Sequence, residues 1–228
     1  MGTPRNSPGE QAAIVRDRLS EAYPDATISL DFSNRLELLI AVVLSAQCPD
    51  ERVNAVTDSL FETYRSPEDY ARTEADELSE AIGSITYPNS KAEYLTGIGQ
   101  QLLEDHDGEV PDTMEELTAL PGVGRKTANV VLQHGHDLTE GVVVDTHVMR
   151  LSKRLGITQE SRRNSIEQDL MDVLPREQWK EFTHLLIAHG RAVCTARNPD
   201  CEDCVLEDVC PSSRLDNDVD LASGESWE

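Results

Sequence analysis

Leu-Pro-Gly-Val-Gly-Arg-Lys-Thr-Ala, at residues 120–128, is the most informative stretch of this sequence. Before it, Thr113 and Glu116 stand in capping-box spacing, which predicts a short helix that ends at the Pro-Gly pair. After it, the pattern over 125–134 is helical again, with Gly135 as the expected C-cap. The stretch therefore predicts a helix, a two-glycine hairpin and a second helix.

Such a hairpin directs backbone N–H groups and a helix N-terminus outward, which makes a ready site for a phosphate. An ordinary tight turn between two helices is the alternative interpretation. Lys126 favours a nucleic-acid-binding site over an ordinary turn. A cation is unfavourable in the first helical turn, next to the positive end of the macrodipole, and the free amine of this lysine could act as a nucleophile.

The charge distribution is uneven. The net charge of −23, from 43 acidic and 20 basic residues, on its own argues against a DNA-binding protein. However, residues 117–159 hold three acidic and five basic residues, a net charge of +2, and neither 81–92 nor 182–199 contains an acid. An acidic coat with neutral or cationic windows indicates an anion-binding face.

Composition also bears on the environment of the protein. Many acids, few lysines and 4% aromatic residues resemble the proteins of extreme halophiles, and an acidic mesophilic protein is the alternative. There is no signal peptide and no run of about 18 apolar residues. We therefore expect a cytoplasmic protein, in which disulfides are rare. Its five cysteines need another explanation.

The periodicity of the rest of the chain predicts an all-α protein of about ten helices, with no credible sheet and no internal repeat. Residues 1–8 are expected to be a flexible tail, and 212–228 an acidic disordered tail. Helices are expected at about 9–23, 35–44, 50–65, 73–85, 91–105, 146–155, 161–174 and 176–189, with a short one from 67 and a brief extended segment at 142–144.

Four cysteines lie in one short loop, spaced Cys194-x6-Cys201-x2-Cys204-x5-Cys210. A structural zinc site with four cysteine ligands is one interpretation. Zinc ribbons, however, pair two short knuckles across roughly 15–20 residues, whereas these cysteines form one compact group. A [4Fe–4S] cluster fits this loop better. Cys48 lies in a predicted buried helix and is expected to be part of the core.

Asp145 stands where the extended segment enters a helix, in the sequence Val-Asp-Thr-His. On sequence alone it is best interpreted as an N-cap. A carboxylate held ionised at a positive helix end could also act in catalysis, so the two roles are compatible. His147 is as consistent with a structural role as with a functional one.

Lys126 on the hairpin, Asp145 about twenty residues later and the four-cysteine loop occur together and in this order. In this combination the chain resembles the endonuclease III family of DNA glycosylases. The resemblance runs from about residue 10 to 211. It includes four further motifs: Leu44-Ser45-Ala46-Gln47, Asn89-Ser90-Lys91-Ala92, Gly108-Glu109-Val110-Pro111 and Ala188-His189-Gly190.

The resemblance implies a fold of two α lobes with a cleft between them. One lobe is a six-helix barrel from about 29 to 138, with the helix-hairpin-helix at 113–135. The other combines 9–28 with 139–211 and holds the [4Fe–4S] cluster, which helps to shape a DNA-binding loop and takes no part in bond breaking. The implied protein is a monomer that works on double-stranded DNA in the nucleoid.

The resemblance also implies an activity. A bifunctional glycosylase and AP lyase of this family removes oxidised pyrimidines flipped out of the duplex and cleaves 3′ to the abasic site by β-elimination. Lys126 would face Asp145 across the cleft and attack C1′ of the sugar to form a Schiff base. Asp145 would accept a proton or stabilise developing positive charge.

DNA contacts are implied for a further set of residues. Gln47 would fill the gap left by the flipped nucleotide, and Tyr87 stands where the family often has a leucine wedge. Arg197 is the one basic residue between the first two cluster cysteines, where the family has several. The remaining expected contacts are Lys91, Gly122, Val123, Gly124, Arg125, Thr127, His147 and Arg150.

Fewer phosphate contacts would make binding less sensitive to salt, since each contributes a slope of about −0.9 in log affinity against log salt. At about 1 M salt the Debye length is near 3 Å, so an acidic coat would scarcely repel DNA. We therefore expect the protein to need high salt to stay folded and to bind.

Three alternatives remain. Adenine-mismatch glycosylases generally lack the lysine and carry an extra C-terminal domain, and thymine-mismatch glycosylases usually lack the lysine too. A non-catalytic iron–sulfur DNA-binding module is disfavoured because Lys126 and Asp145 occur together.

Overall fold

The computed structural model describes residues 6–215, which form eleven α-helices and two short 3₁₀ turns, with no β-strand in that range. The expected all-α fold is confirmed. The chain divides into two compact units, Ser29–Glu140 and a second that combines Met1–Ile28 with Gly141–Glu228. We call them the continuous unit and the split unit, respectively. None of the described helices is long and apolar enough to cross a membrane.

The continuous unit is built around a largely apolar helix. Its α-helices are α2 (Arg35–Leu44), α3 (Asp50–Thr63), α4 (Pro67–Arg72), α5 (Ala75–Ala81), α6 (Pro88–Asp105), α7 (Met114–Ala119) and α8 (Arg125–Gly135). Every residue of α2 from 38 to 44 is buried. The helix can be apolar all round because α3, α6 and α8 pack against it.

Two glycines allow helices of this unit to pack closely. A Cβ on Gly99 of α6 would lie 2.6 Å from the carbonyl oxygen of Pro67, so α4 rests directly on the α6 backbone. A Cβ on Gly135 of α8 would lie 3.3 Å from Leu38 of α2. Gly135 is not the C-cap that the sequence predicts, because α8 continues through it to a C-cap at His136.

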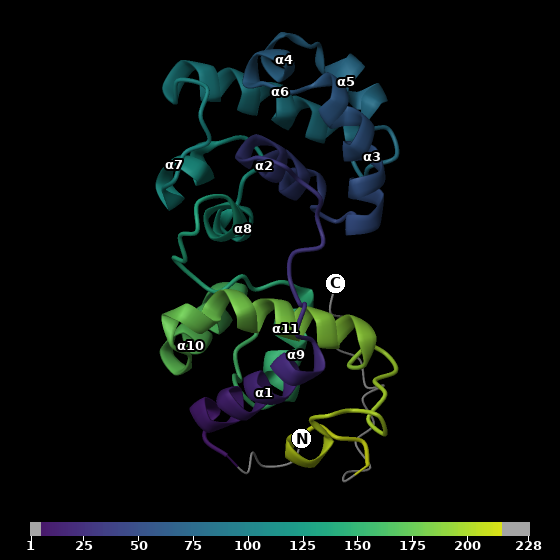
Figure 1. The fold of residues 1–228 in the computed structure, drawn as a ribbon, viewed down its shortest axis with the longest axis vertical. Helices are drawn as coiled ribbons and strands as arrows, with labels where there is room; N and C mark the ends of the chain where they lie inside the picture. The colour runs from purple at the N-terminus through teal and green to yellow at the C-terminus, as the bar shows by residue number, and fades with distance from the viewer. Residues whose placement is uncertain (1–5, 216–228) are drawn as a thin grey trace. The chain divides into compact units, whose positions relative to one another are not determined.

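The split unit joins the beginning of the chain to its last third. Its α-helices are α1 (Pro8–Ala22), α9 (Thr146–Arg154), α10 (Arg163–Val173) and α11 (Trp179–Ala192), with 3₁₀ turns at Arg176–Gln178 and Glu207–Val209. Figure 1 shows α1, in purple, beside the green α9 and α11. Leu19 of α1 shares one core with Leu151 of α9 and Phe182 of α11. Residues distant in sequence thus complete a single hydrophobic core.

The described ends of the chain are more ordered than the sequence predicts. The first helix starts at Pro8, with Ser7 as its N-cap, so the expected flexible tail of residues 1–8 is too long. Ser212 and Ser213 are buried and belong to the split unit, whereas they were expected in the acidic tail. The other residues of the two expected tails, 1–5 and 216–228, lie outside the described residues.

The start of α6 also differs from the prediction. The sequence predicts a helix from about residue 91, whereas the helix begins at Pro88. Its N-cap is Tyr87, which has a left-handed backbone, φ 58° and ψ 55°. Pro88 is suited to the first helical position because its ring presets φ and it has no N–H to satisfy there.

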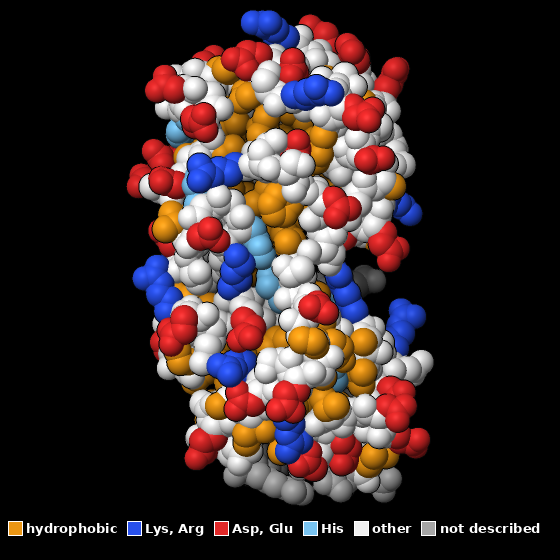
Figure 2. Space-filling view, viewed as in Figure 1, with side chains coloured by type: hydrophobic (Ala, Val, Ile, Leu, Met, Phe, Trp, Pro, Cys, Tyr) orange, Lys and Arg blue, Asp and Glu red, His pale blue; other side chains and the backbone are white. Residues whose placement is uncertain are grey.

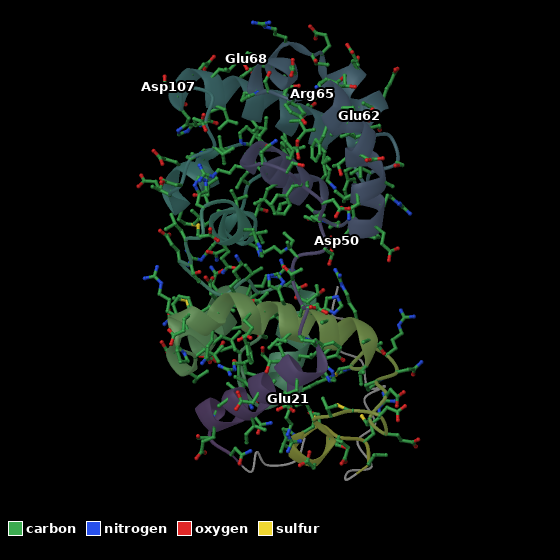
Figure 3. All side chains as sticks on the ribbon, viewed as in Figure 1. Glu21, Asp50, Glu62, Arg65, Glu68 and Asp107 are labelled. Carbon is green, nitrogen blue, oxygen red and sulfur yellow. The ribbon has the colours of Figure 1, made fainter. Side chains whose placement is uncertain are left out.

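The surface carries the acidic coat that the composition predicts. Figure 2 shows Asp and Glu side chains spread over the visible face of each unit, with fewer Lys and Arg among them. Glu21, Glu62 and Asp107, labelled in Figure 3, are among these exposed acids.

Candidate functional site

The predicted helix-hairpin-helix is present in the continuous unit. Thr113 is the N-cap of α7, and its side chain accepts a hydrogen bond from the amide of Glu116. The turn between α7 and α8 contains Gly122, whose φ of +71° is in the left-handed region that glycine tolerates best. The sequence prediction of this motif is therefore confirmed.

The inner side of the hairpin packs tightly against the rest of the continuous unit. Val123 is only 6% exposed, and its amide donates to the carbonyl of Leu120 at 3.2 Å. Val123 therefore anchors the turn and has no free amide for DNA, which corrects the expectation that it contacts the nucleic acid. On Gly122, a Cβ would lie 2.5 Å from the ring of Tyr94 on α6, so the turn is packed directly against that ring.

The outward side of the hairpin is the N-terminus of α8. Gly124 is its N-cap and provides no side-chain cap. The first backbone bond of the helix runs from the amide of Ala128 to the carbonyl of Gly124, and helix geometry leaves the amides before it without intrahelical acceptors. Lys126 is exposed in this first turn. Backbone amides at a helix N-terminus beside an exposed lysine form a site suited to a phosphate and a nucleophile.

Asp145 lies in the split unit, at the start of α9. Its Oδ1 accepts a hydrogen bond from the amide of Val148 at 2.8 Å, so the predicted N-cap is confirmed. Burial lowers the pKa of His147 and lowers that of His184 to about 4, and the Asp145 carboxylate opposes both shifts. Two largely neutral imidazoles therefore lie in the electrostatic field of this carboxylate.

Arg150 does not fit the expected role of a DNA contact. It is 4% exposed, and its guanidinium donates to the carbonyl of Gly190 at 3.0 Å and to that of Cys194 at 3.0 and 3.2 Å. It also donates to Nδ1 of His147 at 3.1 Å. Arg150 therefore joins α9 to the end of α11 and to the start of the cysteine loop.

Lys91 is likewise internal. Its side chain is 4% exposed, and Nζ donates to the carbonyl of Leu44 at 2.8 Å and to that of Ala46 at 2.6 Å. Burial lowers its pKa, and the nearby Cys48 opposes this shift. With its donors directed at two backbone carbonyls, Lys91 does not match the expected DNA contact. Cys48 is 7% exposed, as expected for a core residue.

Several expected DNA contacts are exposed. Gln47 and Tyr87 project from the continuous unit, and Tyr87 is 62% exposed. Arg125 is exposed at the first position of α8, and Thr127 is half-buried. Arg197 is exposed on the cysteine loop of the split unit, where its carbonyl accepts from Arg214 at 2.9 Å.

All four loop cysteines line one cavity of the split unit, and none forms a disulfide. Burial raises the pKa of the Cys204 thiol to about 11 and that of Cys210 to about 12. Thiols in this environment need a cationic centre to be held as thiolates, so the donor set fits a metal centre.

The four thiols by themselves suit two kinds of metal centre. Four cysteine thiolates can bind a single zinc ion, and four can also bind an iron–sulfur cluster, in which each cysteine holds a different iron atom.

Sequence reasoning missed the polar groups that support this loop. Arg154 donates to Cys194 Sγ at 3.3 Å, to the carbonyl of Thr195 at 2.8 Å and to that of Ala196 at 2.7 Å. His189 places Nε2 3.4 Å from Cys204 Sγ, and its Nδ1 lies 3.1 Å from the hydroxyl of Tyr23. The two arginines of α9, 150 and 154, are four residues apart and so share a helix face, which was the available sequence signal.

Comparisons with known proteins agree with both the helix-hairpin-helix and the cysteine loop. Residues 40–176 match the HhH-GPD superfamily of base excision DNA repair proteins. Residues 194–210, the cysteine loop, match the iron–sulfur binding domain of endonuclease III.

Individual relatives match most of the chain. Endonuclease III of Synechocystis sp. is 48% identical over 86% of this chain and 90% of that protein. The enzyme of Escherichia coli is 42% identical over 86% of this chain and 92% of that protein. A solved structure of a trapped endonuclease III–DNA covalent intermediate superposes with a TM-score of 0.87 and 41% identity, covering 91% of this chain and 98% of that one.

The contacts of Arg154 generate a prediction. Arg154→Met removes three hydrogen bonds from residues 194–196, so the cluster should be lost about 10- to 100-fold faster under chelator. The decay of visible absorbance would measure this. Arg162→Met, which removes an exposed cation of the same unit, should leave the decay unchanged. Equal decay in the two variants would contradict a supporting role for Arg154.

Proposed function

Because this chain belongs to the endonuclease III family of base-excision DNA glycosylase/AP lyases, we propose that Lys126 and Asp145 carry its reaction. The chain binds DNA and holds an iron–sulfur cluster as this family does. The substrates proposed for it are oxidised pyrimidines and abasic sites in double-stranded DNA.

The observation that carries this proposal is the exposed Lys126 beside the first-turn amides of α8, to which the N-cap Gly124 provides no side-chain hydrogen bond. A phosphate bound by those amides would place a neighbouring sugar within reach of the amine. The covalent complex formed by a relative that is 41% identical is consistent with a nucleophile on the protein.

The proposed chemistry uses the chain's own groups. The neutral amine of Lys126 attacks C1′, and the base departs with the electrons of the glycosidic bond. The ammonium formed on the new bond loses its proton, and the sugar ring opens to a protonated Schiff base. Loss of a C2′ proton then expels the 3′ phosphate by β-elimination. Asp145 accepts a proton or stabilises the positive charge on the sugar.

The exposed candidates supply the DNA contacts in this proposal. Gln47 and Tyr87 enter the duplex at the flipped nucleotide, and Arg197 on the cysteine loop binds a phosphate. The cluster keeps that loop in place and takes no part in bond breaking. The phosphate contacts at the hairpin are Gly122, Gly124, Arg125 and Thr127.

The acidic coat supports a proposal about the salt concentration in which the protein works. We infer a monomer that works in concentrated salt in the cytoplasm, at the nucleoid of an extreme halophile. Exposed acids outnumber exposed cations among the described residues, and the visible faces in Figure 2 carry many acids. Concentrated salt screens the repulsion between these acids and DNA.

Replacement of Lys126 tests the nucleophile. Lys126→Gln keeps a polar, slightly shorter side chain and removes the amine, so borohydride should trap no adduct on abasic-site DNA. Wild type should form an adduct that peptide mass spectrometry places on Lys126, and the control Lys153→Gln should form it too. An adduct on Lys126→Gln would rule out this nucleophile. Wild type that binds DNA with a filled cluster and gives no adduct would point to a monofunctional glycosylase or a binding module.

Asp145→Asn tests the negative charge of this residue separately from its role as the N-cap of α9. Asparagine caps a helix about as well as aspartate, so stability should stay within about 0.5 kcal/mol in urea unfolding. Single-turnover base excision should fall by about 10²–10⁴-fold, because the proton acceptor is lost. Unchanged excision would leave Asp145 with its N-cap role alone.

The salt dependence of wild type tests the halophilic inference. Base excision and cluster retention should both be greatest near or above about 1 M KCl, where repulsion between acids is screened. A monotonic rise in activity as KCl is diluted to low millimolar levels would contradict it.

A further inference from the structure

Two exposed residues of the continuous unit have an unusual backbone. The described non-glycine residues with left-handed φ are Gln47, Tyr87, Asp107 and Asp137. Aspartate tolerates this region because its short side chain bonds locally, whereas Gln47 and Tyr87 do not have that advantage. Tyr87 also precedes Pro88, which restricts the backbone of the residue before it. Such conformations persist only where the surroundings hold them.

Gln47 is held by the peptide groups on both sides of it. The carbonyl of Ala46, immediately before Gln47, accepts a hydrogen bond from Lys91 Nζ at 2.6 Å. The amide of Cys48, immediately after it, donates to the carbonyl of Ser45 at 3.1 Å. Because both flanking peptide planes are fixed, the left-handed φ of 54° is fixed with them.

Lys91 also closes the end of α2. Its Nζ donates to the carbonyl of Leu44, the last residue of that helix, at 2.8 Å. The last carbonyls of a helix have no intrahelical donors and carry the negative end of the macrodipole. A buried ammonium therefore suits this position. The start of α3 at Asp50, labelled in Figure 3, follows directly after this turn.

The same residue connects to Tyr87. The backbone amide of Lys91 donates to the carbonyl of Tyr87 at 3.1 Å, in the first turn of α6. This is the first backbone bond of the helix, which any residue but proline would make at this position. The side chain of Lys91 thus fixes the turn of Gln47, and α6 carries Lys91 four residues after Tyr87.

We propose that Lys91 is a positioning residue that holds the turn of Gln47 in place before DNA binds, so that Gln47 is ready to enter the duplex at the flipped nucleotide. The proposal rests on the proposed function of Gln47 as a DNA contact. It replaces the expectation that Lys91 itself binds DNA.

The first experiment needs no DNA. Cys48 is 7% exposed and follows Gln47 directly, so its alkylation by iodoacetamide reports on opening of this turn. In the cluster-loaded protein, Lys91→Met should alkylate at Cys48 at least about tenfold faster than wild type, measured by peptide mass spectrometry. Arg52→Met removes an exposed cation from α3 and should react like wild type. An unchanged rate in Lys91→Met would overturn the proposal.

A second variant covers the case in which Lys91→Met does not fold. Lys91→Gln keeps a neutral donor for one carbonyl and should show a smaller rise in Cys48 alkylation. If Lys91→Met does not fold and Cys48 of Lys91→Gln is alkylated as slowly as that of wild type, the proposal is overturned.

The second experiment tests whether Lys91 acts through Gln47. Lys91→Met and Gln47→Ala should each slow single-turnover excision of an oxidised pyrimidine by about 10- to 100-fold. The double variant should be no slower than the slower of the two single variants, because both substitutions remove the same placed side chain, that of Gln47. Multiplied effects would mean that Lys91 acts independently, and the proposal would fail.

Salt dependence separates positioning from phosphate binding. Lys91→Met should leave the slope of log affinity against log salt unchanged, whereas loss of a phosphate contact would reduce it by about 0.9 and overturn the proposal. Wild type that excises no oxidised pyrimidine would refute the proposed function alone, since the Cys48 measurement still decides whether Lys91 holds the turn.

Discussion

The contact between α2 and α8 is the constraint on which the candidate DNA site depends. Gly135 has no side chain, so α8 lies close to Leu38, and Arg35 Nε donates to the carbonyl of Gly135 at 2.8 Å. The C-terminal end of α8 is thereby fixed to the buried helix of the unit. Because a helix is stiff, its N-terminal end, which carries Lys126, is fixed as well.

Buried cations are a second feature of this structure, and they are unexpected in a chain of net charge −23. Lys91, Arg150 and Arg154 are each less than a tenth exposed, and all three donate to backbone carbonyls. A buried charge must be paired or hydrogen-bonded, and carbonyls near helix ends provide acceptors at the negative end of the dipole. The chain therefore uses some of its few cations internally, which leaves its surface still more acidic.

The site residues that sequence reasoning placed correctly depend on short-range spacing. Thr113 and Asp145 cap helices because each stands three residues before an amide that it can reach. The four cysteines share a cavity because they lie in one loop. Gly122 turns the hairpin because its backbone is left-handed. Lys91 and Arg150, which sequence reasoning placed wrongly, depend instead on contacts with distant parts of the chain.

By itself, the sequence determined the all-α class, the helix-hairpin-helix and the cysteine loop, since periodicity, capping and spacing act over a few residues. Only the tertiary structure decided which cations are available to DNA and which are internal. A lysine or arginine in the sequence shows its charge, whereas its burial depends on which carbonyls the packed helices bring within reach. Lys91 illustrates this, because its partners at Leu44 and Ala46 meet it only when α6 packs on the end of α2.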